Sequence, residues 1–211
     1  TYFPKQHQGG MASFGELLTL IHEKWEQDRA SLLGPAEEIM FLLSQSQTES
    51  GKADPGLLGE AVGLYKRLFD RENGGFGGAP KFPSPHNLLF LLAYYRRRED
   101  QDCLEMAERT LTQMYRGGLF DHIGGGFCRY STDERFLVPH FEKMLYDNAL
   151  MTLAYCEAYG VTRKKLYLLA AERTADFVLR EMTSPKGGFY SAQDADSDGE
   201  EGKYYLFTPE E

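Results

Sequence analysis

Several features that would mark a membrane, secreted or nucleic-acid-binding protein are missing from this sequence. Its 211 residues hold only three cysteines, Cys103, Cys128 and Cys156, and no C-x-x-C pair. An odd number of distant cysteines argues against a disulfide framework or a cysteine metal site and favours a reducing compartment, so we expect a cytoplasmic protein. No run of about 18 apolar residues is present to span a bilayer. With a formal net charge of −9, the chain has no basic surplus to neutralise the phosphates of a nucleic acid or an anionic membrane.

The chain also lacks the ends of a typical complete protein. It starts at Thr1 without Met or a signal-like segment, and it stops at residues 208–211, which resemble the start of a helix. We therefore expect a piece of a longer protein. Its apolar fraction of 42% is that of a globular domain, so a folded core is expected rather than disorder.

What the sequence does contain is a series of helical patterns. Ser13 and Glu16 form a capping box that starts a helix extending to about residue 33. Gly34-Pro35 predicts an interruption before a second helix, and the turn-rich residues 47–55 are typical of a linker. Five further helices are expected, over 56–70, 86–98, 101–116, 141–160 and 163–182.

These five helices alternate between two types. The first, third and fifth carry one apolar stripe, whereas the helices at 86–98 and 141–160 are apolar nearly all round, which predicts outer and inner rows. Each long link after an outer helix contains Gly-Gly-Phe, starting at Gly74, Gly125 and Gly187, so the repeat spacings are 51 and 62 residues. The prediction is an all-α fold, part of an (α/α)6 toroid of helical hairpins whose long loops share one end. An ordinary helical bundle is the alternative.

The middle loop, residues 117–140, carries most of the candidate chemistry. A small β-hairpin is expected over 127–130 and 135–138. Polar side chains then fill the predicted first turns of the next inner helix, where Lys143 and Asp147 are spaced to form an ion pair. His140 at the positive end of this helix would favour a neutral imidazole. The sequence predicts a general acid/base set with these members: His140 and His122 as proton carriers, Glu142 as acid or orienter, Asp121 beside them, Arg129 as a clamp, and Tyr146 and Asp147 nearby. The alternative is that these groups cap the backbone within a buried network.

The other two loops add fewer candidates. Lys81 is expected to line the same mouth, although packing is an equally available role for this loop. Asp194 and Asp196 begin an Asp-x-Asp-x-Asp-Gly run that resembles half of a calcium loop. Tyr205 stands where the bidentate Glu of such a loop belongs, so no metal is expected. These aspartates are predicted to face the central pocket or to form a solvated turn, followed by a short strand over 203–207.

Five motifs carry a resemblance to a known family. They are Thr1-Tyr2-Phe3-Pro4, Gly74-Gly75-Phe76 with Ala79-Pro80-Lys81-Phe82-Pro83, Asp121-His122-Ile123-Gly124 continuing to Ser131-Thr132-Asp133, Val138-Pro139-His140-Phe141-Glu142-Lys143-Met144-Leu145-Tyr146-Asp147-Asn148, and Gly187-Gly188-Phe189-Tyr190-Ser191-Ala192 with Asp194-Ala195-Asp196-Ser197. With these motifs the chain resembles the spermatogenesis-associated protein 20 family over nearly its whole length.

The resemblance implies a thioredoxin-like domain joined to a six-hairpin toroid similar to those of sugar 2-epimerases and some glycosidases. Residues 1–33 would be the end of the thioredoxin-like domain, 34–55 a connecting helix and linker, and 56–211 the first half of the toroid. The implied function is sugar epimerisation or isomerisation without a cofactor, with a small sugar and the rest of the same chain as partners and with Tyr130 stacking on the sugar. The alternatives are glycoside hydrolysis by paired carboxylates, a non-catalytic recognition module, and a thiol-redox protein whose redox motif lies upstream.

Overall fold

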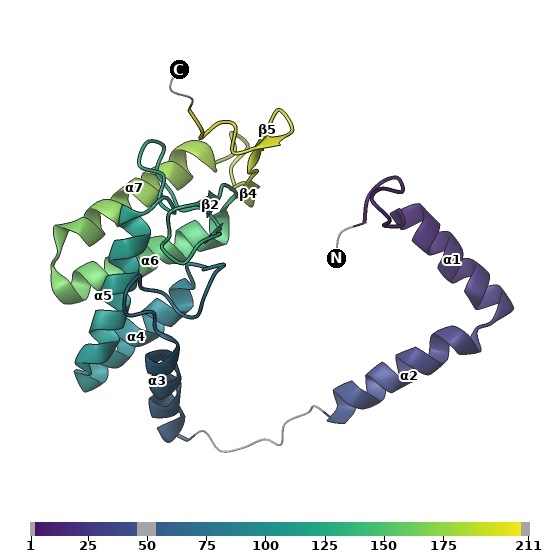
Figure 1. Ribbon diagram of the computed structural model, residues 1–211, viewed down its shortest axis with the longest axis horizontal. Helices are drawn as coiled ribbons and strands as arrows, with labels where there is room; N and C mark the ends of the chain where they lie inside the picture. Colours follow the sequence, from purple (N-terminus) through teal and green to yellow (C-terminus); the bar gives the residue numbers. More distant parts are fainter. Residues whose placement is uncertain (1–2, 46–53, 208–211) are drawn as a thin grey trace. The chain divides into compact units, whose positions relative to one another are not determined.

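The computed structural model describes residues 3–45 and 54–207, and the chain divides into two compact units, Thr1–Asp54 and Pro55–Glu211. Most of the predicted linker 47–55 lies outside the described residues. The first unit contains α1 (Phe14–Gln27) and α2 (Ala30–Gln45) (Figure 1). The second unit contains α3 (Gly56–Leu68), α4 (Pro85–Arg98), α5 (Gln101–Arg116), β1 (Tyr130–Ser131), β2 (Pro139–His140), β3 (Lys143–Met144), α6 (Leu145–Thr162), α7 (Lys165–Glu181), β4 (Ala192–Gln193), β5 (Asp196–Ser197) and β6 (Glu200–Glu201).

The first unit confirms the predicted capping box and corrects the predicted helix break. The Glu16 N–H donates to Oγ of Ser13 at 3.2 Å, and the Ser13 N–H donates to the Glu16 carboxylate at 2.7 Å. The chain breaks at Asp28 rather than at Gly34-Pro35, and α2 runs through Pro35. A proline near the start of a helix removes one backbone hydrogen bond, and the bonds after it can still form. The assignment of residues 1–33 to a thioredoxin-like domain stays a prediction.

The second unit is built from antiparallel helical hairpins. Helix α4 packs against α5 and α6, and α6 packs against α7. Helix α4 ends at Glu99 and α6 ends at Arg163, each followed by a short link. Both residues adopt a left-handed conformation, and the N–H of each donates to a carbonyl in the last turn of its helix. The core between the helices is closed by residues such as Leu91, Leu111 and Tyr155, none of which is exposed. The predicted hairpin order is therefore confirmed.

Helix α6 differs from its prediction at both its start and its surface. It begins at Leu145 instead of near residue 141, because the Leu145 N–H donates to the carbonyl of Ser191 and the preceding residues pair as strands. The sequence predicts burial on all sides, yet Leu150 is 38% and Leu153 47% exposed. Helices α4, α5 and α7 of the second unit contact α6, and these two leucines stay exposed to solvent.

The strands lie in the long loops rather than in a sheet of their own. The predicted hairpin exists but is shifted, because β1 pairs with β2 so that Tyr130 lies opposite His140. Strand β3 pairs with β4, and β5 with β6 around a turn at Asp198 and Gly199 that both have positive φ. The predicted strand over 203–207 is wrong, since residues 202–205 form a turn.

The first two long loops repeat one structure in detail. Asp70 and Asp121 each receive two backbone N–H groups from residues two and three positions later. A buried lysine then binds each aspartate and a glycine carbonyl: Nζ of Lys81 contacts Asp70 at 2.5 Å, and Nζ of Lys143 contacts Asp121 at 2.7 Å. We call these two Asp–Lys units the loop latches. The predicted pair of Lys143 with Asp147 is wrong, because the latch takes the lysine.

Candidate active site

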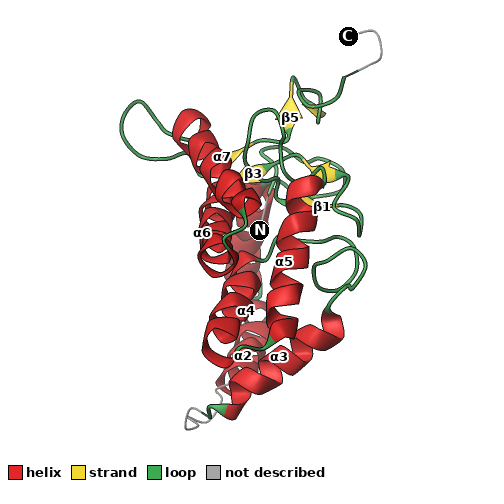
Figure 2. Ribbon diagram, turned by 90° about the vertical axis from the view of Figure 1, so that its left-hand side faces the viewer, coloured by secondary structure: helices red, strands yellow, loops and turns green. Residues whose placement is uncertain are grey.

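The three glycine-marked loops converge at one end of the helices, as the sequence predicts. A bridge between Lys81 and Ser131 joins the first loop to the second. The β3–β4 pair joins the second loop to the third. Figure 2 shows the strands and long loops gathered at one end of α5, α6 and α7. Side chains from all three loops therefore share one region of the second unit.

His140 lies at the centre of this region on an aromatic stack. Its imidazole is nearly parallel to the ring of Tyr130, with ring centroids 4.9 Å apart. The ring of Phe82, from the first loop, also packs against Tyr130, with ring centroids 5.0 Å apart. Phe82 is 52% exposed, so this stack presents an apolar surface to solvent. Aromatic surfaces of this kind are suited to the apolar face of a sugar ring.

Two carboxylates hold the imidazole of His140. Nδ1 lies 2.6 Å from Oε1 of Glu201, and Nε2 lies 3.8 Å from Oε2 of Glu142. The imidazole is 24% exposed, so it is oriented but still reachable from solvent. A carboxylate bound to one ring nitrogen fixes the tautomer and supports proton transfer at the other. Glu201 was not among the predicted site residues. A hairpin turn at Asp198-Gly199 would have placed Glu201 opposite Asp196 on the neighbouring strand.

Arg129 and Glu142 form the second layer of the site. The guanidinium of Arg129 donates to the Glu142 carboxylate at 2.7 Å, and the Arg129 N–H donates to the Glu142 carbonyl at 2.7 Å. The bond to Glu142 raises the pKa of Arg129, and Tyr146 adds to this effect. Nε of Arg129 is buried and has no hydrogen-bond partner among residues 3–45 and 54–207. The predicted clamp therefore retains one donor that its neighbours do not use.

Asp147 lies beneath this layer, in the first turn of α6. It is only 7% exposed. Burial raises the pKa of its carboxyl to about 6; Arg129 opposes the rise and Glu142 adds to it. His140, Glu142, Arg129, Tyr130, Tyr146 and Asp147 thus lie in one region, and we call these six residues with Glu201 the His140 cluster.

Other predicted site residues have structural partners instead. Lys81 and Asp121 belong to the loop latches. Burial raises the pKa of Asp121, but the hydrogen bond and charge of Lys143 outweigh it, so the pKa lies below its usual value. In the first latch, burial of Asp70 is likewise outweighed by the Asn73 N–H and Lys81, and its pKa is also lowered. These groups hold the loops that carry the His140 cluster.

His122 lines a separate hollow of about 640 Å³. Its ring packs edge-on against Tyr115 and Phe120, and no contact within the described chain joins it to His140. Cys128 lines the same hollow, where burial raises the pKa of its thiol to about 12. A thiol in this state is a poor nucleophile.

The aspartates of the third loop lie at its surface. Asp194 is exposed and accepts the N–H of Asp196 at 3.2 Å. Asp196 pairs in register with Glu201, and this is its link to the His140 cluster. Among the described residues no group of three or more His, Cys, Asp or Glu is arranged to hold a metal ion.

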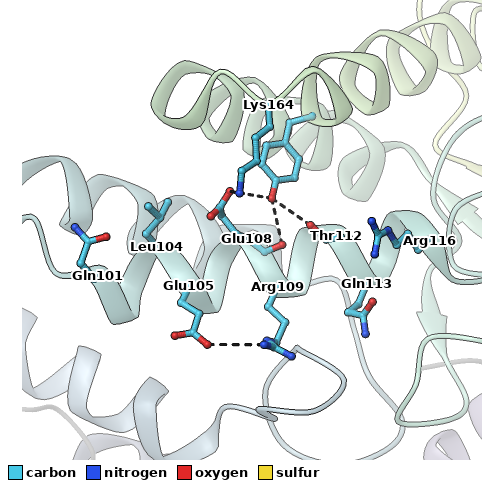
Figure 3. Close-up of a pocket in the computed structure, with 10 residues that line it drawn as sticks. Gln101, Leu104, Glu105, Glu108, Arg109, Thr112, Gln113, Arg116 and Lys164 are labelled. Atoms are coloured by element: carbon cyan, nitrogen blue, oxygen red, sulfur yellow. Dashed lines mark hydrogen bonds and ion pairs between the residues drawn. The ribbon is translucent and has the colours of Figure 1, made fainter.

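A further hollow of about 600 Å³ is lined by residues along α5 together with Lys164 and Tyr167 (Figure 3). Its central carboxylate, Glu108, binds Nζ of Lys164 at 2.6 Å and receives the hydroxyl of Tyr167 at 3.2 Å. The polar groups in its centre are therefore paired with one another, so we place no function there.

No helix in the described parts of the chain is long and apolar enough to cross a membrane.

Comparison with known proteins identifies relatives over the whole chain. The sequence is 40% identical to human spermatogenesis-associated protein 20 and 38% identical to the rat protein over 229 aligned residues, which include 100% of this chain. An uncharacterised Caenorhabditis elegans protein is 36% identical over 93% of the chain. The chain belongs to the spermatogenesis-associated protein 20 family. It spans only about 29% of the length of the human and rat proteins. No family model matches the sequence.

Solved structures similar to this chain are sugar-processing enzymes. Cellobiose 2-epimerase from Bacillus thermoamylovorans has a TM-score of 0.58 at 20% identity, covering 67% of this chain and 42% of that one. A sugar epimerase from a ruminal bacterium has a TM-score of 0.57 at 21% identity, covering 65% of this chain and 40% of that one. A D-mannose isomerase has a TM-score of 0.55 at 18% identity, covering 67% of this chain and 42% of that one. At these identities the likeness shows the fold, which is a partial (α/α)6 toroid.

Proposed function

We propose that the His140 cluster is part of a carbohydrate-processing site that epimerises or isomerises a small sugar by proton transfer. The observation that carries the proposal is the imidazole of His140, which Glu201 binds at 2.6 Å and Tyr130 supports by stacking, with Glu142 3.8 Å away. Sugar epimerases and an isomerase share the toroid, and this likeness of fold supports the choice of substrate class.

In this proposal His140 removes the proton next to the carbonyl of an open-chain sugar. Glu201 holds the imidazole, and Arg129 holds Glu142 beside it. Tyr130 and Phe82 support the apolar face of the sugar. His122, Asp194 and Asp196 remain predictions without a side-chain contact to this cluster, and Asp121 and Lys81 are assigned to the loop latches. The remainder of the longer protein would complete the site.

Hydrolysis of a glycosidic bond is the second candidate, and one observation favours it. The site holds a carboxylate paired with Arg129, namely Glu142, beside the buried carboxyl of Asp147 whose pKa is raised. Two carboxyls in contrasting environments are what acid-assisted hydrolysis uses. A glycoside hydrolase family 76 mannosidase shares the fold with a TM-score of 0.52 at 17% identity, covering 61% of this chain and 36% of that one.

Sugar-dependent thermal stabilisation of the full-length protein tests the proposal, because a ligand of the folded state raises the melting temperature. Glucose, mannose and cellobiose are the probes. We expect at least one to stabilise the wild type and to lose its effect in His140→Gln. His22→Gln, an exposed histidine on α1, is the matched control. If no neutral sugar shifts the melting temperature and none is converted, the proposal is wrong.

A further inference from the structure

The carboxyl of Asp147 differs from the other partly buried aspartates of the second unit in its hydrogen bonds. Asp70, Asp100, Asp121 and Asp133 each accept at least two backbone N–H groups, and the first three also bind a lysine. The Asp147 side chain is only 7% exposed, and it accepts no backbone N–H group from the described residues. An ionised carboxylate in such a place is costly, so the neutral form with its O–H donor is favoured.

The charges around Asp147 partly offset one another, because Arg129 lowers its pKa and Glu142 raises it. The guanidinium of Arg129 is already bound to Glu142 at 2.7 Å, so it neutralises that carboxylate first. Glu201 adds a third carboxylate on the far side of His140. Burial is therefore the main reason why Asp147 holds its proton; Arg129 opposes this effect and Glu142 adds to it.

The Arg129 side chain has a hydrogen-bonding group that the rest of the cluster does not use. Nε of Arg129 is a buried donor without a partner among the described residues. The Asp147 side chain is only 7% exposed. The positive charge of Arg129 opposes the rise in the pKa of Asp147, and Glu142, which Arg129 binds, adds to that rise. Buried polar groups in folded proteins are normally satisfied, so the unused donor of Arg129 indicates the place of a ligand oxygen atom.

We propose that Asp147 is the proton donor of this site and passes its carboxyl proton to the carbonyl oxygen of a bound sugar. This inference rests on the proposed function and assigns the acid that the reaction needs besides His140. The sugar oxygen would lie between Asp147 and Nε of Arg129.

The proton and electron balance closes with groups that the cluster already holds. His140 takes the proton from the carbon next to the carbonyl, and the electron pair of that C–H bond forms the carbon–carbon double bond of an enediol. The carbonyl π pair moves to its oxygen, which takes the proton from Asp147. His140 then gives its proton to the former carbonyl carbon. The hydroxyl on the neighbouring carbon passes its proton to Asp147 and becomes the new carbonyl, so both residues are restored and the isomer is released.

The test compares Asp147→Asn with the exposed control Asp176→Asn in the full-length protein. The asparagine keeps the shape of the side chain but cannot supply an acidic proton. With a sugar that the wild type converts, we expect kcat to fall about 100-fold or more in Asp147→Asn, with KM changed less than threefold. The wild-type rate should decline as pH rises above about 6, and the variant should lose this decline. Carbon-13 NMR titration of the wild-type carboxyls supplies a measurement that does not depend on the variant.

Three results would overturn the inference. An Asp147→Asn protein that keeps kcat within twofold would exclude a proton donor at this position while the proposed function stands. An Asp147 carboxyl that titrates in the ordinary range of aspartates would do the same, even if the variant fails to fold. Absence of any sugar binding or conversion in the wild type would remove the proposed function, and this inference with it.

Discussion

Nδ1 of His140 lies 2.6 Å from Oε1 of Glu201, although 61 residues separate them in the sequence. The third loop thus contributes the carboxylate of Glu201, which orients the imidazole of His140 in the second loop. We expect Glu201→Gln to lower sugar turnover about tenfold or more, because an amide orients the ring less strongly than a carboxylate and does not stabilise its protonated form.

The stability of Glu201→Gln should stay within about 0.5 kcal/mol of the wild type, since Glu201 is exposed. Glu200→Gln, in the same strand but paired with Ser197, is the matched control and should keep full turnover. Equal turnover in both variants would show that Glu201 does not act through His140.

The loop latches should account for a large part of the stability of the second unit. Lys143→Met leaves the buried Asp121 without its cation, which we expect to lower the free energy of unfolding by about 3–5 kcal/mol. Lys203→Met removes an exposed pair with Asp198 and should cost about 0–1 kcal/mol. Urea unfolding of both variants measures the difference, and equal losses would contradict a structural role for the latch.

The latches also predict how stability responds to acid. The folded-state pKa of Asp121 lies below its unfolded value, so its contribution is present above about pH 4 and is lost as pH falls through the folded pKa. Unfolding measured between pH 7 and pH 3 should therefore show a steeper loss in the wild type than in Lys143→Met.

Asp147 should have the opposite effect on the pH dependence of stability. Its folded pKa is raised from 3.8 to about 6, so the folded state binds its proton more tightly than the unfolded state. Stability should fall by about 2–3 kcal/mol as pH rises from about 4 to 7, because ionisation of the buried carboxyl is unfavourable. Asp147→Asn should lack this decrease. Identical pH profiles of unfolding for the two proteins would contradict a raised pKa.

Two glycines provide a matched test of the loop conformation. Gly126 has φ of +81°, and a Cβ atom there would lie 2.4 Å from Cδ1 of Phe177. We expect Gly126→Ala to destabilise the protein by about 2 kcal/mol or more. Gly160 is helical, and a Cβ atom there meets nothing within 4 Å, so Gly160→Ala should stabilise by about 0.5–1 kcal/mol. Thermal unfolding distinguishes the two, and a neutral Gly126→Ala would contradict the described loop.

The cysteines give a prediction about thiol chemistry in this segment. Cys103 and Cys128 are buried, and burial raises their pKa values to about 11 and 12, whereas Cys156 is exposed. A maleimide should label only Cys156 in the folded segment and all three cysteines in denaturant. Fast labelling of Cys128 in the native protein would reopen a nucleophilic or redox role for it.

The hairpins could be predicted from sequence because their signals are local. Amphipathic stripes and the repeated Gly-Gly-Phe motifs gave the helices and the common end of the loops. The start of α6 could not be predicted from sequence, because residues 139–144 are compatible with a helix. They contain β2 and β3 only because these segments pair with β1 and β4. The helix break predicted at Gly34-Pro35 was wrong, since α1 already ends at Asp28, before the proline.

The members of the candidate site were easier to predict than their partners. His140, Glu142 and Arg129 stand out by residue type, but the latch between Lys143 and Asp121 depends on how the loop folds. Its signal was present, since Asp70 and Asp121 both stand four residues before Gly-Gly-Phe. Comparing the two loops with each other, rather than Lys143 with its helical neighbours, would have assigned the lysine correctly.

Each loop latch closes largely within its own stretch of chain, from an aspartate to a lysine no more than 22 residues away. The shape of each loop is consequently secured without help from the side chains that point outward from it. Residues such as Tyr130 and His140 are therefore open to replacement during evolution at little risk to folding, and a scaffold of this kind can acquire new chemistry one loop at a time.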